Sequence, residues 1–255
     1  MPTALLVSPH PDDELLGCPA HLFALRDSGW RIVNLPVSYG SAPERREQRR
    51  RELEAACRAA GFELLDAPAD LQQSQEGRDE QAAAASLASL AAELETDLLC
   101  APSPHDLHPL HEWCGRVAVE AFERGAGERL WLWSIWGPLP VVNSVCSFEP
   151  RRLNEIDLAL KAHIGETDRA DLPRLLRAQA EADSVLLGER AFPFGGRVDL
   201  GTLAEGVLEV MRSDGLLRMC APSLFDPRSL PDAATGPGVD SWLRAPSASA
   251  LLAGG

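Results

Sequence analysis

The sequence predicts an α/β fold with a mostly parallel sheet and helices on both of its faces. Apolar segments alternate with amphipathic ones through the first half of the chain, which is typical of β-α-β units. The 255 residues, 45% of them hydrophobic, suffice for one sizeable core. Neither an internal repeat nor a linker interrupts the chain, so we expect a single Rossmann-like domain over residues 1–255.

The expected elements follow from hydrophobic period and from helix-ending glycines such as Gly29 and Gly61. In order, they are a buried strand at 3–8, a helix at 20–29, a strand at 30–38, a helix at 43–60, a weak strand at 62–68, a helix at 79–95, strands at 97–103 and 129–137, and helices at 151–163 and 173–186. From about Ser223 the chain has no clear period, so we expect a loop-rich cap or partial disorder, with disorder over the last ten residues.

Composition excludes several classes of function. The formal charge of −14 opposes binding to nucleic acid or to anionic lipid. No apolar run reaches the roughly 18 to 20 residues that a membrane helix needs, and the N-terminus lacks the basic segment of a secretion signal.

The six cysteines form no C-x-x-C pair, so we expect buried reduced thiols. Lys161 is the only lysine among 24 basic residues, a bias typical of a GC-rich bacterium. We expect a cytoplasmic location.

The stretch SPHPDDELLG, residues 8–17, places a histidine and three acids directly after the first strand. In open α/β sheets ligands bind outside the carboxyl ends of the strands, which brings this stretch, 38–46 and 102–115 to one edge. His10 and Asp13 can both turn inward from a tight loop that Pro11 stiffens. They supply two metal ligands, whereas catalytic zinc usually takes three from the protein.

Half of the six histidines lie in PSPHDLHPLHEWCG, residues 102–115. Pro109 makes a continuous helix improbable at that point, so a helix begins near Leu110 and places His111 on its first turn, facing the strand ends. Because position 115 is glycine, the stretch is not an H-E-x-x-H zinc motif. A nucleophile elbow, a Walker A loop and a dinucleotide turn are also absent from the sequence.

An alternative interpretation treats PHPDDE as a solvated turn in which Asp12 or Asp13 caps the following helix. Its coincidence with three histidines on the same predicted edge favours a metal site.

The sequence resembles the LmbE or PIG-L family of zinc-dependent N-deacetylases. The resemblance is carried by PHPDDELLGC after the first strand and HPLH after a later one, where the family shows [AP]-H-P-D-D-E and H-P-D-H. Arg49 and Glu52, followed nine residues later by Gly61, and the segment ALKAH ending at His163 extend it over residues 3–190.

The resemblance implies roles for particular residues. Asp12 would take a proton from a metal-bound water, and His108 would assist the oxyanion or protonate the departing amine. Glu14 would order the loop. The metal, one zinc per chain, would be bound by His10, Asp13 and His111. An N/O site of this kind can also hold iron or cobalt.

The chain departs from the family pattern at Leu110, which stands where the family has an aspartate. The carboxylate that would orient and charge His108 is therefore missing, and a histidine without such a partner is less readily protonated at neutral pH. We hypothesise that Asp106 replaces it.

Other side chains allow weaker expectations. Trp131 and Trp133 share one strand face and are expected in the core, whereas Trp136 leaves the strand and is expected to touch substrate. We expect His105 to be a loop residue, His21 a packed helix residue, Arg49 and Glu52 a local ion pair, and Tyr39 and His163 either rim or structural residues.

The resemblance implies hydrolysis of an N-acetyl or N-acyl group on an amino-sugar conjugate, with a small-molecule substrate such as a natural-product glycoside or a thiol-cofactor precursor. Two alternatives stay open. One is an amidase acting on another amide conjugate, and the other is a non-catalytic protein that binds metal or ligand. The sequence does not specify an oligomeric state.

Overall fold

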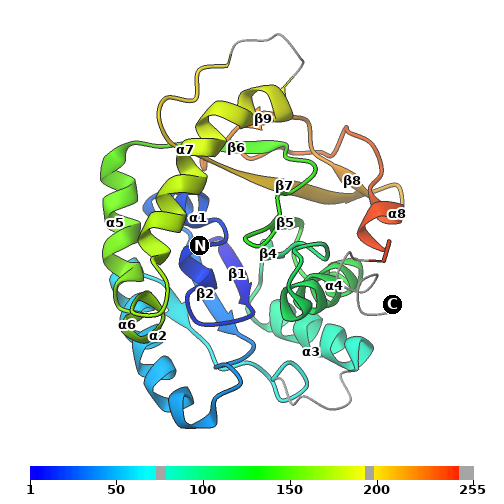
Figure 1. The fold of residues 1–255 in the computed structure, drawn as a ribbon. Helices are drawn as coiled ribbons and strands as arrows, with labels where there is room; N and C mark the ends of the chain where they lie inside the picture. Colours follow the sequence, from blue (N-terminus) through cyan, green and yellow to red (C-terminus); the bar gives the residue numbers. More distant parts are fainter. Residues whose placement is uncertain (73–78, 193–197, 247–255) are drawn as a thin grey trace.

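The computed structural model describes residues 1–72, 79–192 and 198–246, and its centre is a nine-stranded sheet between two layers of helices (Figure 1). The main strand order is β3-β2-β1-β4-β5-β7-β6-β9, with β8 paired to β7. This architecture confirms the predicted α/β class with a mostly parallel sheet and flanking helices.

The first five strands run parallel. They are β3 (Glu63–Leu64), β2 (Arg31–Pro36), β1 (Thr3–Ser8), β4 (Leu98–Pro102) and β5 (Arg129–Trp133). β1 lies between β2 and β4, and all six of its residues are buried. A strand covered on both faces needs an almost continuous apolar run, which explains why TALLVS predicts β1 with its observed bounds.

The far side of the sheet is largely antiparallel and was not predicted. β7 (Ala204–Ser213) pairs antiparallel with β5, with β6 (Ser144–Ser147) and with β8 (Leu216–Met219), while β9 (Ser223–Leu224) runs parallel to β6. The apolar pattern of β7 is interrupted by a buried acid, Glu209, which pairs with Arg129 of β5 at 3.1 Å. Such a partner on another strand cannot be read from local periodicity.

Alternate side chains of β1 point into two different cores. Leu5 and Val7 pack with α3 (Glu80–Glu93), α4 (Pro109–Glu123) and α8 (Asp240–Leu243). Ala4 and Leu6 belong to the opposite core. The helices on that side are α1 (Pro19–Asp27), α2 (Arg46–Ala60), α5 (Pro150–Leu160) and α7 (Leu172–Ala191), and the short α6 (Ile164–Thr167) joins α5 to α7.

The segment after Ser223 is a loop-rich cap. It contains β9 and α8, and the Leu243 side chain of α8 is buried in the same core as α4. The expected disorder of the last ten residues falls almost wholly on 247–255, which lie outside the described residues. Among the helices that the structure describes, none combines the length and apolar character needed to cross a bilayer.

The carboxyl ends of the parallel strands meet at one edge, as the topology rule predicts. The segments that leave β1, β2, β4 and β5 begin after Ser8, Pro36, Pro102 and Trp133 respectively. They bring together the two histidine-containing stretches that the sequence places about a hundred residues apart.

Candidate metal centre

The loop after β1 has a strained backbone that a buried acid holds in place. Asp12 has φ 110°, a left-handed conformation that L residues rarely adopt, and the single-turn helix Asp13–Leu15 follows it. Glu14 is fully buried, and its carboxylate accepts a hydrogen bond from the Asp12 backbone N–H at 2.9 Å. The other carboxylate oxygen lies 2.6 Å from His163 Nε2. Glu14 therefore orders the loop, as the sequence predicts.

Asp13 points back toward the start of the same loop. Its Oδ2 accepts a hydrogen bond from the His10 backbone N–H at 2.8 Å and lies 3.3 Å from His10 Nδ1. The φ angle of Asp12 lets the chain turn tightly enough for these two side chains to converge.

His111 lies on the first turn of α4, where the sequence predicts it, and is fully buried. The helix begins at Pro109, and the preceding residue, His108, is its N-cap. Proline is favoured at the first helical position because its missing N–H would have no partner there. The helix start therefore fixes both histidines at the edge of the sheet.

Three ligand atoms form a nearly equilateral triangle. His10 Nδ1, Asp13 Oδ2 and His111 Nε2 lie 3.3 Å from one another in each pair. Ligands about 2.0 to 2.1 Å from a tetrahedral zinc are separated by about 3.3 to 3.4 Å. Within the described residues these three side chains are the group suited to holding a metal ion. Their donor types and spacing fit zinc with a fourth position left for a ligand.

The electrostatics of the triangle follow from burial and mutual contact. Burial alone would lower the pKa of His111, but the carboxylates of Asp13 and Asp106 outweigh it and raise that pKa to about 10. Burial disfavours the charged form of Asp13 too, yet His111 and His10 hold its pKa well below the usual range. Burial, together with the charges of Asp13 and Glu14, raises the pKa of Asp12 well above its ordinary value.

Asp106 is the fully buried partner of His111. Its Oδ2 lies 2.6 Å from His111 Nδ1, which leaves Nε2 turned toward the triangle. Its Oδ1 accepts hydrogen bonds from the backbone N–H groups of Ile135 and Trp136, at 2.8 and 2.9 Å, and from the Ser134 hydroxyl. Because both carboxylate oxygens have other partners, Asp106 does not orient His108 through a hydrogen bond. Its charge raises the pKa of His108, but burial and the neighbouring histidines outweigh it.

His108 is fixed by the helix start. Its Nδ1 accepts a hydrogen bond from the Leu110 backbone N–H at 3.3 Å, and its ring stacks on that of Trp136 with centroids 5.6 Å apart. Burial, and then the neighbouring His111 and His10, lower the pKa of His108 to about 4. The Leu110 side chain is buried in the core that α4 shares with α3, and it supplies no carboxylate to the histidine.

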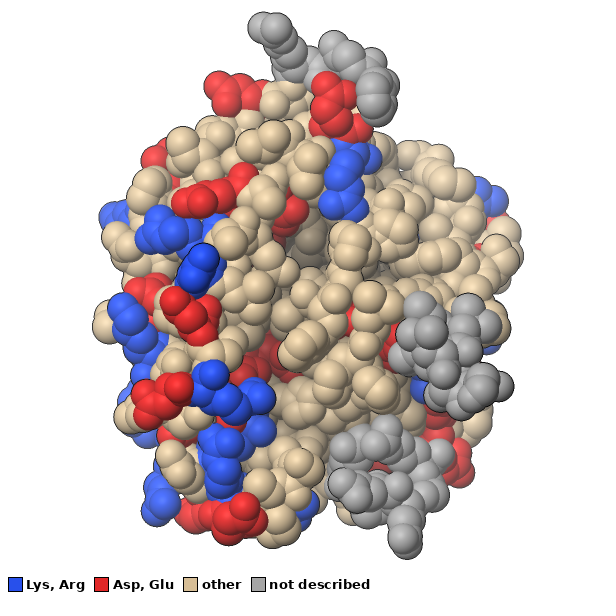
Figure 2. Space-filling model, in the orientation of Figure 1, with Lys and Arg blue, Asp and Glu red and all other residues tan. Residues whose placement is uncertain are grey.

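The triangle lies in the wall of a cavity of about 630 Å³, which Asp12, His108 and Trp136 also line. Trp136 is 61% exposed, which agrees with its expected contact with substrate. Figure 2 shows basic side chains gathered over the helices on the left of the molecule. Arg45, Arg49 and Arg169 line the cavity and converge on one buried acid, Glu166.

The sequence gives no signal for this arginine group. The expected pair between Arg49 and Glu52 is wrong, because Arg49 donates to the Pro11 carbonyl at 3.1 Å and lies 3.6 Å from Glu166. Glu52 instead accepts hydrogen bonds from the Gln48 side chain and the Gly165 N–H. Two of these partners, Glu166 and Gly165, come from α6, more than a hundred residues along the chain.

The remaining expectations are settled by contacts. Trp131 and Trp133 are fully buried in the core, as predicted. His105 is a loop residue bonded to the Trp242 carbonyl, and His21 is a packed residue 2.7 Å from Glu205. His163 is structural through its contact with Glu14, and Tyr39 lines the cavity.

Gly115, one helical turn after His111, allows α4 to approach the loop that carries Asp106. A Cβ atom there would lie 2.5 Å from the Pro104 nitrogen and 2.7 Å from the Pro102 carbonyl oxygen. Gly115→Ala is therefore expected to lower the free energy of unfolding by about 1 to 3 kcal/mol, measured with urea. Gly188→Ala, in α7, is the control, since its Cβ would meet one backbone oxygen at 3.3 Å. Equal stabilities of the two variants would contradict the close approach.

Comparisons with known proteins agree with the fold and with the first motif. A family model described as PIG-L, GlcNAc-PI de-N-acetylase, matches residues 5–122. The comparison with curated proteins returned no match.

Solved structures of similar fold include enzymes of more than one kind. N,N'-diacetylchitobiose deacetylase from Pyrococcus horikoshii is 17% identical, with a TM-score of 0.63 over 81% of this chain and 83% of that one. The zinc-inhibited form of teicoplanin deacetylase Orf2 is 18% identical, with a TM-score of 0.61 over 83% and 99%. GalB, a 4-carboxy-2-hydroxymuconate hydratase from Pseudomonas putida, is 16% identical, with a TM-score of 0.62 over 84% and 98%.

At these identities the structural neighbours establish the fold, and they do not specify the reaction, since a hydratase stands beside deacetylases. The family match covers β1 to α4 and includes all three residues of the triangle. Residues 5–122 therefore match the PIG-L (LmbE-like) family, as the resemblance in the sequence predicts.

Proposed function

We propose that the protein is a zinc-dependent N-deacetylase that removes an N-acetyl or related N-acyl group from an amino-sugar conjugate. The observation that carries the proposal is the 3.3 Å triangle of His10, Asp13 and His111 beside the carboxylate of Asp12, in one cavity wall. The family description and two deacetylases among the structural neighbours support it.

Zinc held by the triangle would supply Lewis-acid activation of the attacking water and of the scissile carbonyl. Asp12, which lines the same cavity, would take the proton of that water as the water oxygen bonds to the carbonyl carbon. When the C–N bond breaks, the same carboxyl group can pass the proton to the departing amine. The balance is one water and one amide consumed, and one carboxylate and one protonated amine formed.

His108 is assigned to the developing oxyanion rather than to the amine. Because the Leu110 N–H donates to Nδ1, the neutral ring carries its proton on Nε2, where it can donate a hydrogen bond. A donor aimed at developing negative charge is an effective means of catalysis, and it needs no carboxylate at position 110. The missing family aspartate is therefore compatible with turnover.

The substrate is proposed to be a small molecule, and a glycosylated natural product or a thiol-cofactor precursor is the preferred class. The exposed Trp136 offers a stacking surface for a sugar or an apolar aglycone. The single-domain organisation over residues 1–255, the cytoplasmic location and a bacterial source stay predictions.

Zinc analysis coupled to an amine-release assay tests the proposal. The protein is loaded with one equivalent of zinc, since one structural neighbour is described in a zinc-inhibited form. Wild type is expected to retain about one zinc per chain and to release amine from at least one N-acetylglucosaminyl conjugate, whereas His111→Ala loses both properties. His105→Ala is the control, because His105 lies in the same loop but bonds the Trp242 carbonyl.

The outcomes separate the alternatives. Unchanged zinc content in His111→Ala would contradict the ligand set. Stoichiometric zinc without amine release from any conjugate would favour the non-catalytic binding protein. Release only from conjugates without a sugar would favour the amidase.

A further inference from the structure

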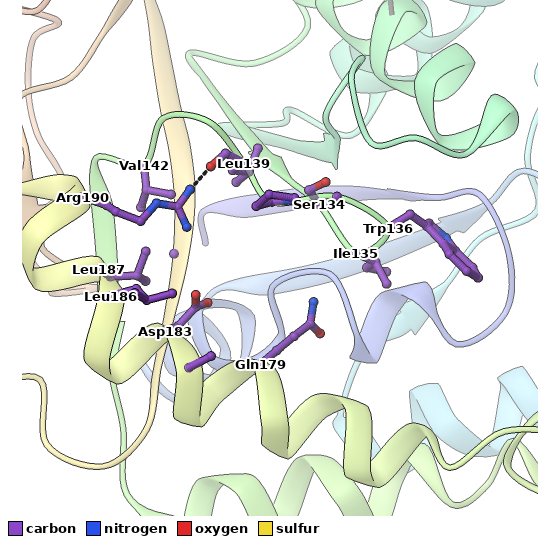
Figure 3. Close-up of a pocket in the computed structure, with 14 residues that line it drawn as sticks. Ser134, Ile135, Trp136, Leu139, Val142, Gln179, Asp183, Leu186, Leu187 and Arg190 are labelled. Carbon is purple, nitrogen blue, oxygen red and sulfur yellow. Dashed lines mark hydrogen bonds between the residues drawn. The ribbon is translucent and has the colours of Figure 1, made fainter. Parts of the chain in front are cut away.

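A second cavity adjoins the metal cavity and has no part in the chemistry described above. It has a volume of about 300 Å³ and lies between the second half of α7 and the loop that leaves β5 (Figure 3). Ile135 and Trp136 line both cavities. A molecule that extends past these two residues can therefore occupy both.

Two polar side chains of α7 face this cavity without a hydrogen-bond partner among the described residues. Gln179 and Asp183 project from the helix toward the loop at Ser134 and Ile135 (Figure 3). No hydrogen bond from another described residue reaches either side chain, although both are partly buried. Burial, with a smaller contribution from Glu205, raises the pKa of Asp183 to about 6. Partly buried polar groups of this kind are normally satisfied by solvent or by a ligand.

The same helix face continues with apolar and basic side chains. Positions 179, 183, 187 and 190 recur at helical spacing, so Leu187 and Arg190 lie beside the two polar residues. Arg190 donates one hydrogen bond to the Leu139 carbonyl (Figure 3), and its planar guanidinium has further N–H donors. The cavity thus combines the carboxylate of Asp183, the amide of Gln179 and the guanidinium of Arg190 with apolar surface from Leu187.

This combination suits a hydroxyl-rich ring. Hydroxyl groups donate to a carboxylate and accept from an amide or guanidinium, while the C–H face of a pyranose packs on apolar and aromatic surface. Trp136, shared by both cavities, provides that aromatic surface at the junction.

We propose that the second cavity binds a second pyranose or polyol ring, linked to the sugar whose N-acyl group the metal centre cleaves. This subsite rests on the proposed function and narrows it to conjugates of at least two hydroxyl-rich rings. Asp183 and Gln179 bond hydroxyl groups of the second ring, and Leu187 packs against it.

Asp106, the hydrogen-bond partner of His111, also fixes the backbone that separates the two cavities. Asp106 accepts hydrogen bonds from the backbone N–H groups of Ile135 and Trp136 and also bonds the ring of His111. One buried carboxylate therefore fixes the spacing between the catalytic triangle and the second ring.

Kinetics on a one-ring and a two-ring substrate test the subsite. The zinc-loaded enzyme is assayed with methyl N-acetylglucosaminide and with N,N'-diacetylchitobiose. Asp183→Ala is expected to lower kcat/KM for the two-ring substrate by about 10-fold or more, mainly through KM, and to leave the one-ring value unchanged. Gln179→Ala is expected to act in the same direction, and Asp183→Asn to lose less than Asp183→Ala.

Glu181→Ala is the matched control. Glu181 lies on the same helix but is exposed, 3.9 Å from Arg177, and is expected to change neither rate. Equal losses of Asp183→Ala on both substrates, or no loss on either, would overturn the subsite while leaving the deacetylase proposal intact.

If wild type releases amine from neither of these two substrates, the subsite is tested by binding alone, and the proposed function is judged by the wider panel of conjugates described above. Equilibrium dialysis of N,N'-diacetylchitobiose then compares wild type with Asp183→Ala. Weaker binding by the variant supports the subsite, and equal binding, or none to wild type, overturns it.

Discussion

Asp12→Asn is expected to lower kcat for amine release by about 10³-fold and to leave zinc content unchanged. The Asp12 carboxylate lines the cavity beside Asp13 but does not belong to the triangle of ligand atoms. An amide cannot take the proton of the attacking water, and a positioned general base contributes about 10² to 10⁴ in rate. Asparagine also tolerates the left-handed φ of 110° at this position, so the loop should keep its conformation.

The neighbouring variant Asp13→Asn provides the contrast. Asp13 Oδ2 is a vertex of the triangle, so this substitution is expected to lose zinc and activity together. Metal analysis and steady-state kinetics on both proteins distinguish the two roles. Loss of zinc in Asp12→Asn would make Asp12 a ligand, and full activity would place the base elsewhere.

Asp106→Ala is expected to weaken zinc binding by about 10- to 100-fold and to lower the free energy of unfolding by about 3 to 5 kcal/mol. The substitution leaves the His111 ring without its partner and two backbone N–H groups without an acceptor at a fully buried site. A chelator competition assay measures the first effect, and urea unfolding of the zinc-free protein measures the second.

Asp106→Asn separates the two effects. The asparagine side-chain oxygen can still accept hydrogen bonds from the backbone N–H groups of Ile135 and Trp136, but the negative charge opposite His111 is gone. We expect most of the stability to return while zinc binding stays weak. Wild-type zinc affinity in Asp106→Ala would show that His111 is oriented by other contacts.

Much of the parallel half of the fold follows from local sequence. β1, α1 and α2 are predicted because buried strands need apolar runs and because Gly61 ends a helix in a left-handed conformation. β7 is not predicted, because Glu209 interrupts its pattern and pairs with Arg129 on another strand.

The ligand triangle is predictable for a different reason. His10 and Asp13 belong to one short motif, and the topology rule brings His111 to the same edge of the sheet. Side chains that support the site are harder to assign, because hydrogen bonds between distant segments leave no local pattern. The sequence indicates that Asp106 supports a histidine, but the hydrogen bond is made to His111 and not to His108, and no local pattern signals the role of Glu166.

The bond between Glu14 and His163 shows how far the loop after β1 depends on the rest of the chain. A fragment ending at residue 122 would keep every ligand residue, yet it would lack the histidine that pairs with the acid under the strained Asp12. Such a fragment could not be transplanted as a working metal-binding module. Grafting the metal site into another sheet would therefore require the residues of the triangle and also the later segment that carries His163.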